Sequence, residues 1–256
     1  MQLLLCSGSD LPGMWAFHAL RGGALPSLEL VTIESLADCS DWEHRVGASG
    51  DRISFRLPDG RTIDDSQIEG VLNRLVFPPQ ELISRAVPAD RDYVQQEMTA
   101  LYLSWLYGLS CPVLNRPTPQ GLAGRWRHAS EWALAAHRAG FDVPVYEQTE
   151  SGPADRGGVS FAGPGESVTQ VVVLDGEVFG SVLPERIRDS CRELADICEM
   201  GLLGIDLLFS LIGGWSFASA TPLPDLEVGG HPLIARLAQA LGAHSETDSR
   251  LKEADS

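Results

Sequence analysis

Lysine is almost missing from this sequence. Of the 256 residues only Lys252 is a lysine, so 18 of the 19 basic residues are arginines. Acidic residues number 35, and the formal net charge is -16. A surface of that sign repels the phosphates of nucleic acids and of anionic lipids, so we expect neither kind of partner. Chemistry that requires a buried lysine amine is excluded for residues 1–251.

The patterns of several common sites are also missing. No run of about 18 apolar residues occurs, so we expect no membrane span. The five cysteines form no CxxC pair, and their odd, scattered number is typical of a reducing compartment. The apolar start, Met1–Cys6, lacks a basic flank and favours a strand over a signal peptide. These features predict a cytoplasmic protein. The sequence has no Gly-x-Ser-x-Gly motif, so we expect no covalent catalysis. Its histidines have no spacing that indicates a metal site.

The composition and the order of apolar segments indicate a globular α/β fold. Gln2–Cys6, Leu11–Leu20 and Leu28–Ile33 have the pattern of a strand, a helix and a second strand, which begins a parallel sheet. Later strands flank Asp175-Gly176 and Gly213-Gly214, which are hairpin turn signals. We therefore predict an α/β protein whose N-terminal parallel strand–helix sheet is followed by a reduced antiparallel α+β lobe.

Composition also predicts the division into domains. Residues 1–146 hold the alternating strands and helices and would form an N-terminal α/β domain. Residues 147–166 are rich in Gly, Pro, Ser and Asp, as in a linker. Residues 167–244 would form the smaller C-terminal lobe. The polar residues 245–256 carry no apolar pattern and predict a flexible tail.

Two polar pairs follow short apolar strands of the first domain. They are Asn73-Arg74 and Asn115-Arg116. Because the carboxyl ends of parallel strands lie at one edge of a sheet, and α/β sheets bind ligands there, we expect these four side chains to come together. They are our first candidates for a ligand-binding or partner-binding site.

A second candidate is the basic and aromatic segment Arg125, Trp126 and Arg127, which stands out in an acidic chain. Arginine and tryptophan dominate binding hot spots, so this segment could recognise an anionic peptide or a partner protein. In the other interpretation, nearby tryptophans pack into the core and the arginines pair with local acids. The sequence leaves both interpretations open.

Three stretches carry a resemblance to a known family. They are Val71–Arg74, then Pro112–Pro117 with Ala135–Pro144, then Gly201–Leu208 with Gly214–Pro222. In order and spacing they resemble the ATP-grasp superfamily, and within it bacterial carboxylate–amine ligases that modify peptides. The resemblance implies that ATP and magnesium bind against the antiparallel lobe, and that an amine attacks an acyl-phosphate.

The same resemblance implies specific ligands, and most of them are missing. Asp206 matches the family's first acidic magnesium ligand, but Ser219 and Thr221 stand where the family has a glutamate and an asparagine. Magnesium prefers charged oxygen ligands, and phosphoryl transfer needs its positive charge. No lysine precedes Lys252, and the 23 residues 145–167 are too few for the small lobe that carries the phosphate-binding lysine. The chain thus resembles a shortened, degenerate member.

Three functions are compatible with these observations. The leading hypothesis is a scaffold without enzymatic activity that binds a peptide, a small metabolite or a partner protein and needs no cofactor. The first alternative is an active ATP-dependent carboxylate–amine ligase, with ATP as cofactor and with magnesium held by Asp206. The second alternative is a purely structural subunit of a larger complex. A homodimer is compatible with all three.

Overall fold

The computed structural model describes residues 1–47, 50–143 and 166–242. The predicted tail, 245–256, and all but the last residue of the predicted linker, 147–166, lie outside the described residues. None of the helices in the described ranges has the length and apolarity that a membrane crossing requires.

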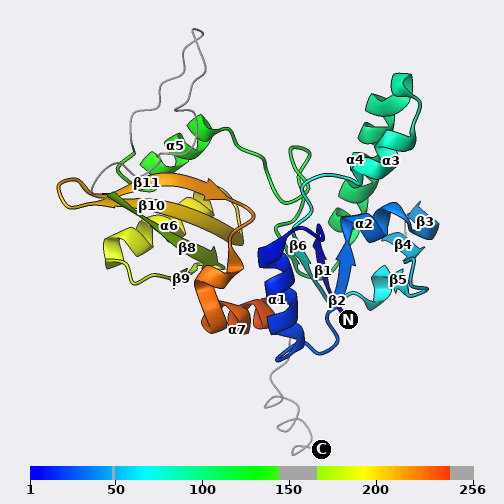
Figure 1. The fold of residues 1–256 in the computed structure, drawn as a ribbon, viewed down its shortest axis with the longest axis horizontal. Helices are drawn as coiled ribbons and strands as arrows, with labels where there is room; N and C mark the ends of the chain where they lie inside the picture. The colour runs from blue at the N-terminus through cyan, green and yellow to red at the C-terminus, as the bar shows by residue number, and fades with distance from the viewer. Residues whose placement is uncertain (48–49, 144–165, 243–256) are drawn as a thin grey trace, which may run out of the picture. The chain divides into compact units, whose positions relative to one another are not determined.

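The chain divides into two compact units (Figure 1). Unit 1 comprises Met1–Arg125 and Ile234–Ser256, and unit 2 comprises Trp126–Leu233. The division therefore falls earlier than the predicted end of the first domain at residue 146, and a second division falls inside the last helix. The predicted domain boundaries stay a prediction, and each unit is described by itself below.

Unit 1 contains a parallel sheet with the strand order β2-β1-β6-β7 and a separate antiparallel sheet with the order β3-β4-β5. Helices and short 3₁₀ helices follow or connect the strands in the described part of residues 1–125, and α4 is the longest of these helices. The elements are β1 (Gln2–Cys6), α1 (Leu11–Arg21), β2 (Glu29–Thr32), α2 (Ile33–Ala37), β3 (Ser40–Gly47), β4 (Gly50–Arg56), β5 (Thr62–Asp64), η1 (Asp65–Gln67), β6 (Gly70–Asn73), α3 (Gln80–Arg85), η2 (Pro88–Asp90), α4 (Arg91–Gly108) and β7 (Val113–Leu114).

The parallel sheet forms because its central strand is apolar on both faces. Every residue of β1 is buried, as expected for a strand that is covered on both sides. Asp10 then caps α1 by accepting a hydrogen bond from the amide of Gly13. The strand–helix–strand arrangement predicted from Gln2 to Ile33 is confirmed, except that Ile33 already begins α2.

An aromatic cluster joins the small antiparallel sheet to α4. The rings of Trp42 and Phe55 stack with their centroids 4.4 Å apart, and Trp105 meets Phe55 edge-on at 5.1 Å. Tyr102 lies in the same cluster, and burial raises the pKa of its hydroxyl. Such pairs add specific geometry to the area that they bury. The cluster fixes the C-terminal half of α4 in the core of unit 1.

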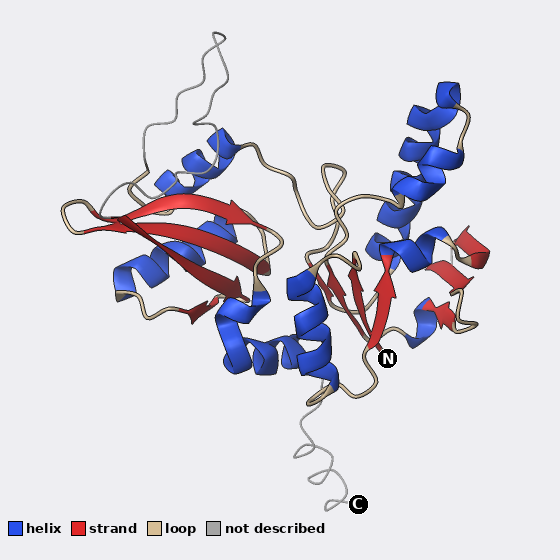
Figure 2. Cartoon of the chain, in the orientation of Figure 1, coloured by secondary structure: helices blue, strands red, loops and turns tan. Residues whose placement is uncertain are grey.

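Unit 2 contains an antiparallel sheet with the strand order β11-β10-β8-β9 (Figure 2). Its strands are joined by the two hairpins that the sequence predicted. The elements are α5 (Ala129–Arg138), β8 (Glu166–Leu174), β9 (Glu177–Gly180), α6 (Glu185–Ile197), β10 (Leu202–Ser210), β11 (Gly214–Thr221), η3 (Leu226–Gly229) and α7 (Gly230–Ala240), the last of which begins in unit 2 and ends in unit 1. The predicted fold class, a parallel α/β sheet followed by an antiparallel lobe, is confirmed.

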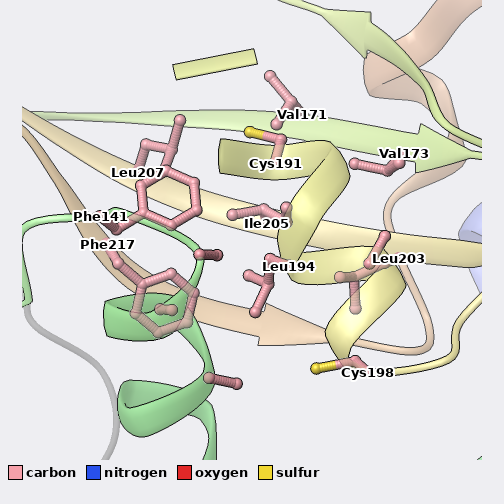
Figure 3. Close-up of a cluster of buried hydrophobic side chains, with 14 of the residues drawn as sticks. Phe141, Val171, Val173, Cys191, Leu194, Cys198, Leu203, Ile205, Leu207 and Phe217 are labelled. Atoms are coloured by element: carbon pink, nitrogen blue, oxygen red, sulfur yellow. The ribbon is translucent and has the colours of Figure 1, made fainter. Parts of the chain in front are cut away.

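One face of the antiparallel sheet carries the core of unit 2 (Figure 3). Alternate residues of β10, Leu203, Ile205 and Leu207, face α6, which presents Cys191 and Leu194. Burial raises the pKa of the Cys191 thiol to about 12, so this cysteine is a core residue without thiolate chemistry. Because side chains alternate along a strand, the residues between these three point to the opposite face, where Asp206 lies.

Candidate functional site

The structure brings Asn73 and Asn115 together at the carboxyl edge of the parallel sheet. The side-chain amide of Asn73 donates to the carbonyl oxygens of Asn115 at 2.9 Å and of Leu122 at 2.6 Å. Its oxygen accepts a hydrogen bond from the amide of Leu75. Asn73 is 1% exposed, and Asn115 adopts a positive φ of 40°. Asn73 therefore holds the connection that follows β7 in place, and its polar atoms contact the protein's own backbone.

Arg74 makes a buried ion pair with Asp10. Its guanidinium donates to both carboxylate oxygens, from Nε at 2.6 Å and from Nη2 at 2.9 Å. This is the bidentate geometry that makes arginine–carboxylate pairs strong. The close approach requires glycine at position 13, because a Cβ there would lie 2.5 Å from the Asp10 carboxylate. The pair ties the end of β6 to the first turn of α1.

Arg116 caps the C-terminal end of α4. It donates to the carbonyl oxygens of Tyr107 at 2.9 Å and of Cys111 at 3.1 Å, and its guanidinium lies 5.9 Å from the centroid of the Tyr107 ring. The last carbonyls of a helix lack partners within the helix and favour a nearby positive charge. Arg116 thus has a structural role, whatever else it contacts.

The segment Arg125–Arg127 divides into two kinds of residue. Arg127 donates to the carbonyl oxygen of Cys198, at the end of α6, and its guanidinium lies 5.2 Å from the centroid of the Trp132 ring. Trp126 is 65% exposed and meets His128 edge-on, and Arg125 is exposed as well. The packing interpretation and the binding interpretation of this segment therefore each apply in part. Arg127 packs against Trp132, whereas the ring of Trp126 is exposed to solvent.

A carboxylate that the sequence did not single out lies close to the loop after β1. Glu34 accepts hydrogen bonds from the amide of Gly8 at 3.0 Å and from the hydroxyl of Ser7 at 3.0 Å. Burial alone would raise its pKa, but the hydrogen bonds from its own amide, Gly8 and Ser7 outweigh that effect and hold the pKa below its usual range. Only the position of Glu34 at the start of α2 could have identified it, and α2 is too short to predict.

Asp206, the predicted metal ligand, has uncharged neighbours. Its Oδ1 accepts a hydrogen bond from the Gln170 amide of β8 at 2.9 Å, and its Oδ2 accepts one from the Ser219 hydroxyl of β11 at 2.5 Å. Thr221, two residues further along the same face, accepts a hydrogen bond from the amide of Leu223 through its hydroxyl oxygen. Asp206 itself is half-buried. The row Gln170, Asp206, Ser219 and Thr221 therefore offers a single negative charge.

This donor set does not fit magnesium with a nucleotide. Within the described residues no group of three or more His, Cys, Asp or Glu side chains could hold a metal ion. Magnesium sites in nucleotide enzymes use carboxylates together with phosphate oxygens, and Asp206 is the only carboxylate in the row Gln170, Asp206, Ser219 and Thr221. No reaction step through bound ATP follows from this geometry.

The comparisons with known proteins identify the fold. No protein-family model matches the chain, and no curated protein sequence matches it. Solved structures do match. The macrocyclase MdnC of Microcystis aeruginosa, bound with the precursor peptide MdnA, aligns at a TM-score of 0.69 and 12% identity over 94% of this chain and 99% of that one.

Two further ligases give the same result. The ATP-grasp ligase PsnB, complexed with a variant of its minimal precursor, Mg and ADP, aligns at a TM-score of 0.66 and 15% identity over 94% of this chain and 97% of that one. A Chryseobacterium gregarium RiPP-associated ATP-grasp ligase is in complex with ADP and a leader and core peptide. It aligns at a TM-score of 0.63 and 10% identity, over 94% of this chain and 95% of that one. The chain therefore has an ATP-grasp-like fold, as its sequence predicted.

We expect Arg74→Ala to destabilise the protein by about 3 kcal/mol, because it leaves the carboxylate of Asp10 without its buried partner. Urea denaturation measures the change. The matched control is Arg85→Ala, whose ion pair with Asp38 is 61% exposed on both sides and should contribute less than about 1 kcal/mol. Equal losses in the two variants would contradict a structural role for the buried pair.

The lowered pKa of Glu34 predicts a pH-dependent contribution to stability. A carboxyl group whose folded pKa lies below its unfolded value stabilises the fold above the unfolded pKa, and this contribution is lost as the pH falls through the folded pKa. The stability difference between wild type and Glu34→Gln should therefore be larger at pH 7 than at pH 3. Thermal denaturation across this range tests it. A difference independent of pH would argue against the Gly8 and Ser7 contacts.

Proposed function

We propose that this chain is a degenerate ATP-grasp-like protein that binds a peptide as a scaffold and carries out no ordinary ATP–magnesium chemistry. The observation that carries the proposal is the environment of Asp206, whose two oxygens accept hydrogen bonds from Gln170 and Ser219. A carboxylate in such a neutral network neither concentrates positive charge nor completes a magnesium site.

The choice of a peptide over a metabolite or a partner protein rests on two kinds of support. MdnC is bound with a precursor peptide, and the Chryseobacterium gregarium ligase is in complex with a leader and core peptide. Unit 2 of this chain also exposes large apolar side chains that water solvates poorly. Trp126 is 65% exposed, and Leu211 and Ile212 in the turn between β10 and β11 are 87% and 100% exposed. Exposed aromatic and aliphatic side chains of this kind favour peptide contacts.

Among the predicted binding residues, Trp126 and Arg125 are the strongest candidates for direct contact. Both side chains are exposed. The remaining five, Asn73, Arg74, Asn115, Arg116 and Arg127, are buried or hold the chain's own carbonyl and carboxylate groups. We propose that these five support the loops, and that Trp126 makes the contact.

An active carboxylate–amine ligase is the second candidate, and the half-buried Asp206 is the observation that favours it. In that case ATP and magnesium would be cofactors, and Asp206 would contact the metal. A ligase should release ADP only when its substrate is present. The two candidates therefore differ in nucleotide binding, which can be measured before any substrate is known.

For the scaffold we expect no heat of binding when magnesium with ATP, or with ADP, is titrated into the protein up to millimolar concentration. Ser219→Glu should gain measurable magnesium binding, because it places a second carboxylate beside Asp206. Isothermal titration calorimetry measures both. Micromolar ATP binding by wild type that disappears in Asp206→Asn would overturn the scaffold and support the ligase.

Peptides selected from a random phage-displayed library against the purified chain can test the contact surface. We expect Trp126→Ala to weaken their binding at least tenfold, as loss of an exposed aromatic hot spot does. The matched control is Val182→Ala, another exposed apolar residue of unit 2, which is 95% exposed and should leave the affinity unchanged. Fluorescence anisotropy measures the affinities. Unchanged affinity in Trp126→Ala would remove this residue from the site.

A further inference from the structure

Helix α5 has a histidine as its N-terminal cap. The amide of Ser130 donates a hydrogen bond to Nδ1 of His128 at 3.3 Å, and the Ser130 hydroxyl lies 2.9 Å from the same nitrogen. In return, the carboxylate of Glu131 accepts a hydrogen bond from the His128 amide at 3.1 Å. These reciprocal contacts form a capping box, which satisfies amides that the helix itself leaves without partners.

The residue type of this cap makes it sensitive to protonation. Nδ1 accepts the Ser130 amide through its lone pair, so the hydrogen of the neutral ring lies on Nε2. A proton added to Nδ1 turns this nitrogen into a donor, and the Ser130 amide then loses its acceptor. The usual caps, which are Asn, Asp, Ser and Thr, keep an acceptor oxygen over the range from about pH 5 to 8 in which histidine changes its charge.

The ring of His128 also supports the ring of Trp126. The two rings meet edge-on, with their centroids 6.2 Å apart. Arg127, which lies between them in the sequence, is fixed by the Cys198 carbonyl and by the face of Trp132. The side chain of Trp126 is 65% exposed, so its position depends on few neighbours. A change in the cap of α5 therefore acts on the residue next to the most exposed ring of this segment.

Charged groups of both signs surround the histidine ring. On its own segment the carboxylate of Glu131 favours the protonated ring, whereas Arg125 and Arg127 oppose it. β11, which packs on α5, carries no titratable side chain. α6, which also packs on α5, has Asp196 in its last turn, and Glu199 follows its end. The response of the cap thus follows from the loss of the acceptor and not from one neighbouring charge.

We propose that His128 is a positioning residue that makes the peptide contact of Trp126 depend on pH. This inference rests on the proposed function, in which Trp126 contacts a peptide. Above about pH 7 the neutral ring caps α5 and lies against Trp126, so the contact is strong. As the pH falls through the range in which histidine is protonated, the cap opens and the support of Trp126 loosens. The affinity for the peptide therefore falls with the pH.

The affinity of a selected peptide at two pH values tests the role of His128. The probe is a rhodamine-labelled peptide without histidine, selected at about pH 7.5 from the phage-displayed library, whose binding weakens in Trp126→Ala. We expect wild type to bind it about fivefold more weakly at about pH 5.5 than at pH 7.5, which is the change in an equilibrium constant that an N-terminal cap typically provides. Fluorescence anisotropy measures the affinities.

Three variants separate titration of the cap from a purely structural role. His128→Asn should bind the peptide equally at both pH values, because asparagine caps a helix without titrating. His128→Ala should bind weakly at both values, because it has no acceptor. The matched control is His137→Asn, which removes the exposed histidine at the other end of α5 and should keep the pH dependence of wild type. Circular dichroism confirms that each variant is folded.

Hydrogen exchange of the Ser130 amide, measured by NMR on the free protein, tests the cap without any peptide. Comparing wild type with His128→Asn at the same pH cancels the intrinsic pH dependence of exchange. We expect similar exchange rates at about pH 7.5, and an amide that exchanges at least about threefold faster in wild type at about pH 5.5, where its acceptor is protonated.

The two measurements distinguish the possible failures. Equal exchange in wild type and His128→Asn at the lower pH would overturn the inference, even where the peptide binds at Trp126. A cap that titrates, together with a peptide affinity independent of pH, would overturn the link between His128 and Trp126. If no selected peptide responds to Trp126→Ala, the contact in the proposed function is wrong and the role of His128 is overturned with it. The exchange rates then show that the contact failed and not the cap.

Discussion

The buried ion pair between Arg74 and Asp10 fixes the carboxyl edge of the parallel sheet, where the contacts of Asn73 also lie. It joins the end of β6 to the first turn of α1, and it requires glycine at position 13. Beside it, Asn73 holds the connection that follows β7 at two points, Asn115 and Leu122. This edge is where open α/β sheets generally bind ligands. In this chain the side chains of Asn73 and Arg74 contact the protein's own backbone and the carboxylate of Asp10.

In the antiparallel sheet of unit 2, internal hydrogen bonds likewise occupy a candidate site residue. Asp206 keeps its position on the face opposite the core, but its partners are an amide and a hydroxyl. A neutral partner satisfies a carboxylate geometrically without neutralising it, whereas a metal site concentrates several such charges around one cation. In both regions the candidate polar side chains are thus engaged by other groups of the protein, within an ATP-grasp-like arrangement of strands and helices.

The sequence predicted those elements whose signal is local. The apolar run of β1 and the Asp-Gly and Gly-Gly turns identify their strands without knowledge of the rest of the chain. The sequence analysis did not predict β3, which is a largely exposed and polar edge strand, or α2, which has only five residues. The closeness of Asn73 and Asn115 followed from the parallel-strand rule, but their roles did not. Arg74 pairs with a residue 64 positions away, and Gln170 reaches Asp206 across 36 positions, so no local pattern could show that these groups are already occupied.

The strong bias toward arginine has a structural consequence that explains why the predicted binding residues turned inward. A guanidinium offers five donors in a fixed plane, and it can bind a carboxylate with two bonds or several carbonyls at once. Arg74 binds a carboxylate with two bonds, and Arg116 donates to several carbonyls. Arg127 donates to a carbonyl and lies over the ring of Trp132. An ammonium group is a compact point charge without a flat face, so it makes neither the bidentate nor the stacked contact. Because these three arginines are fixed within the protein, our proposal assigns the contact with a peptide to exposed side chains such as Trp126.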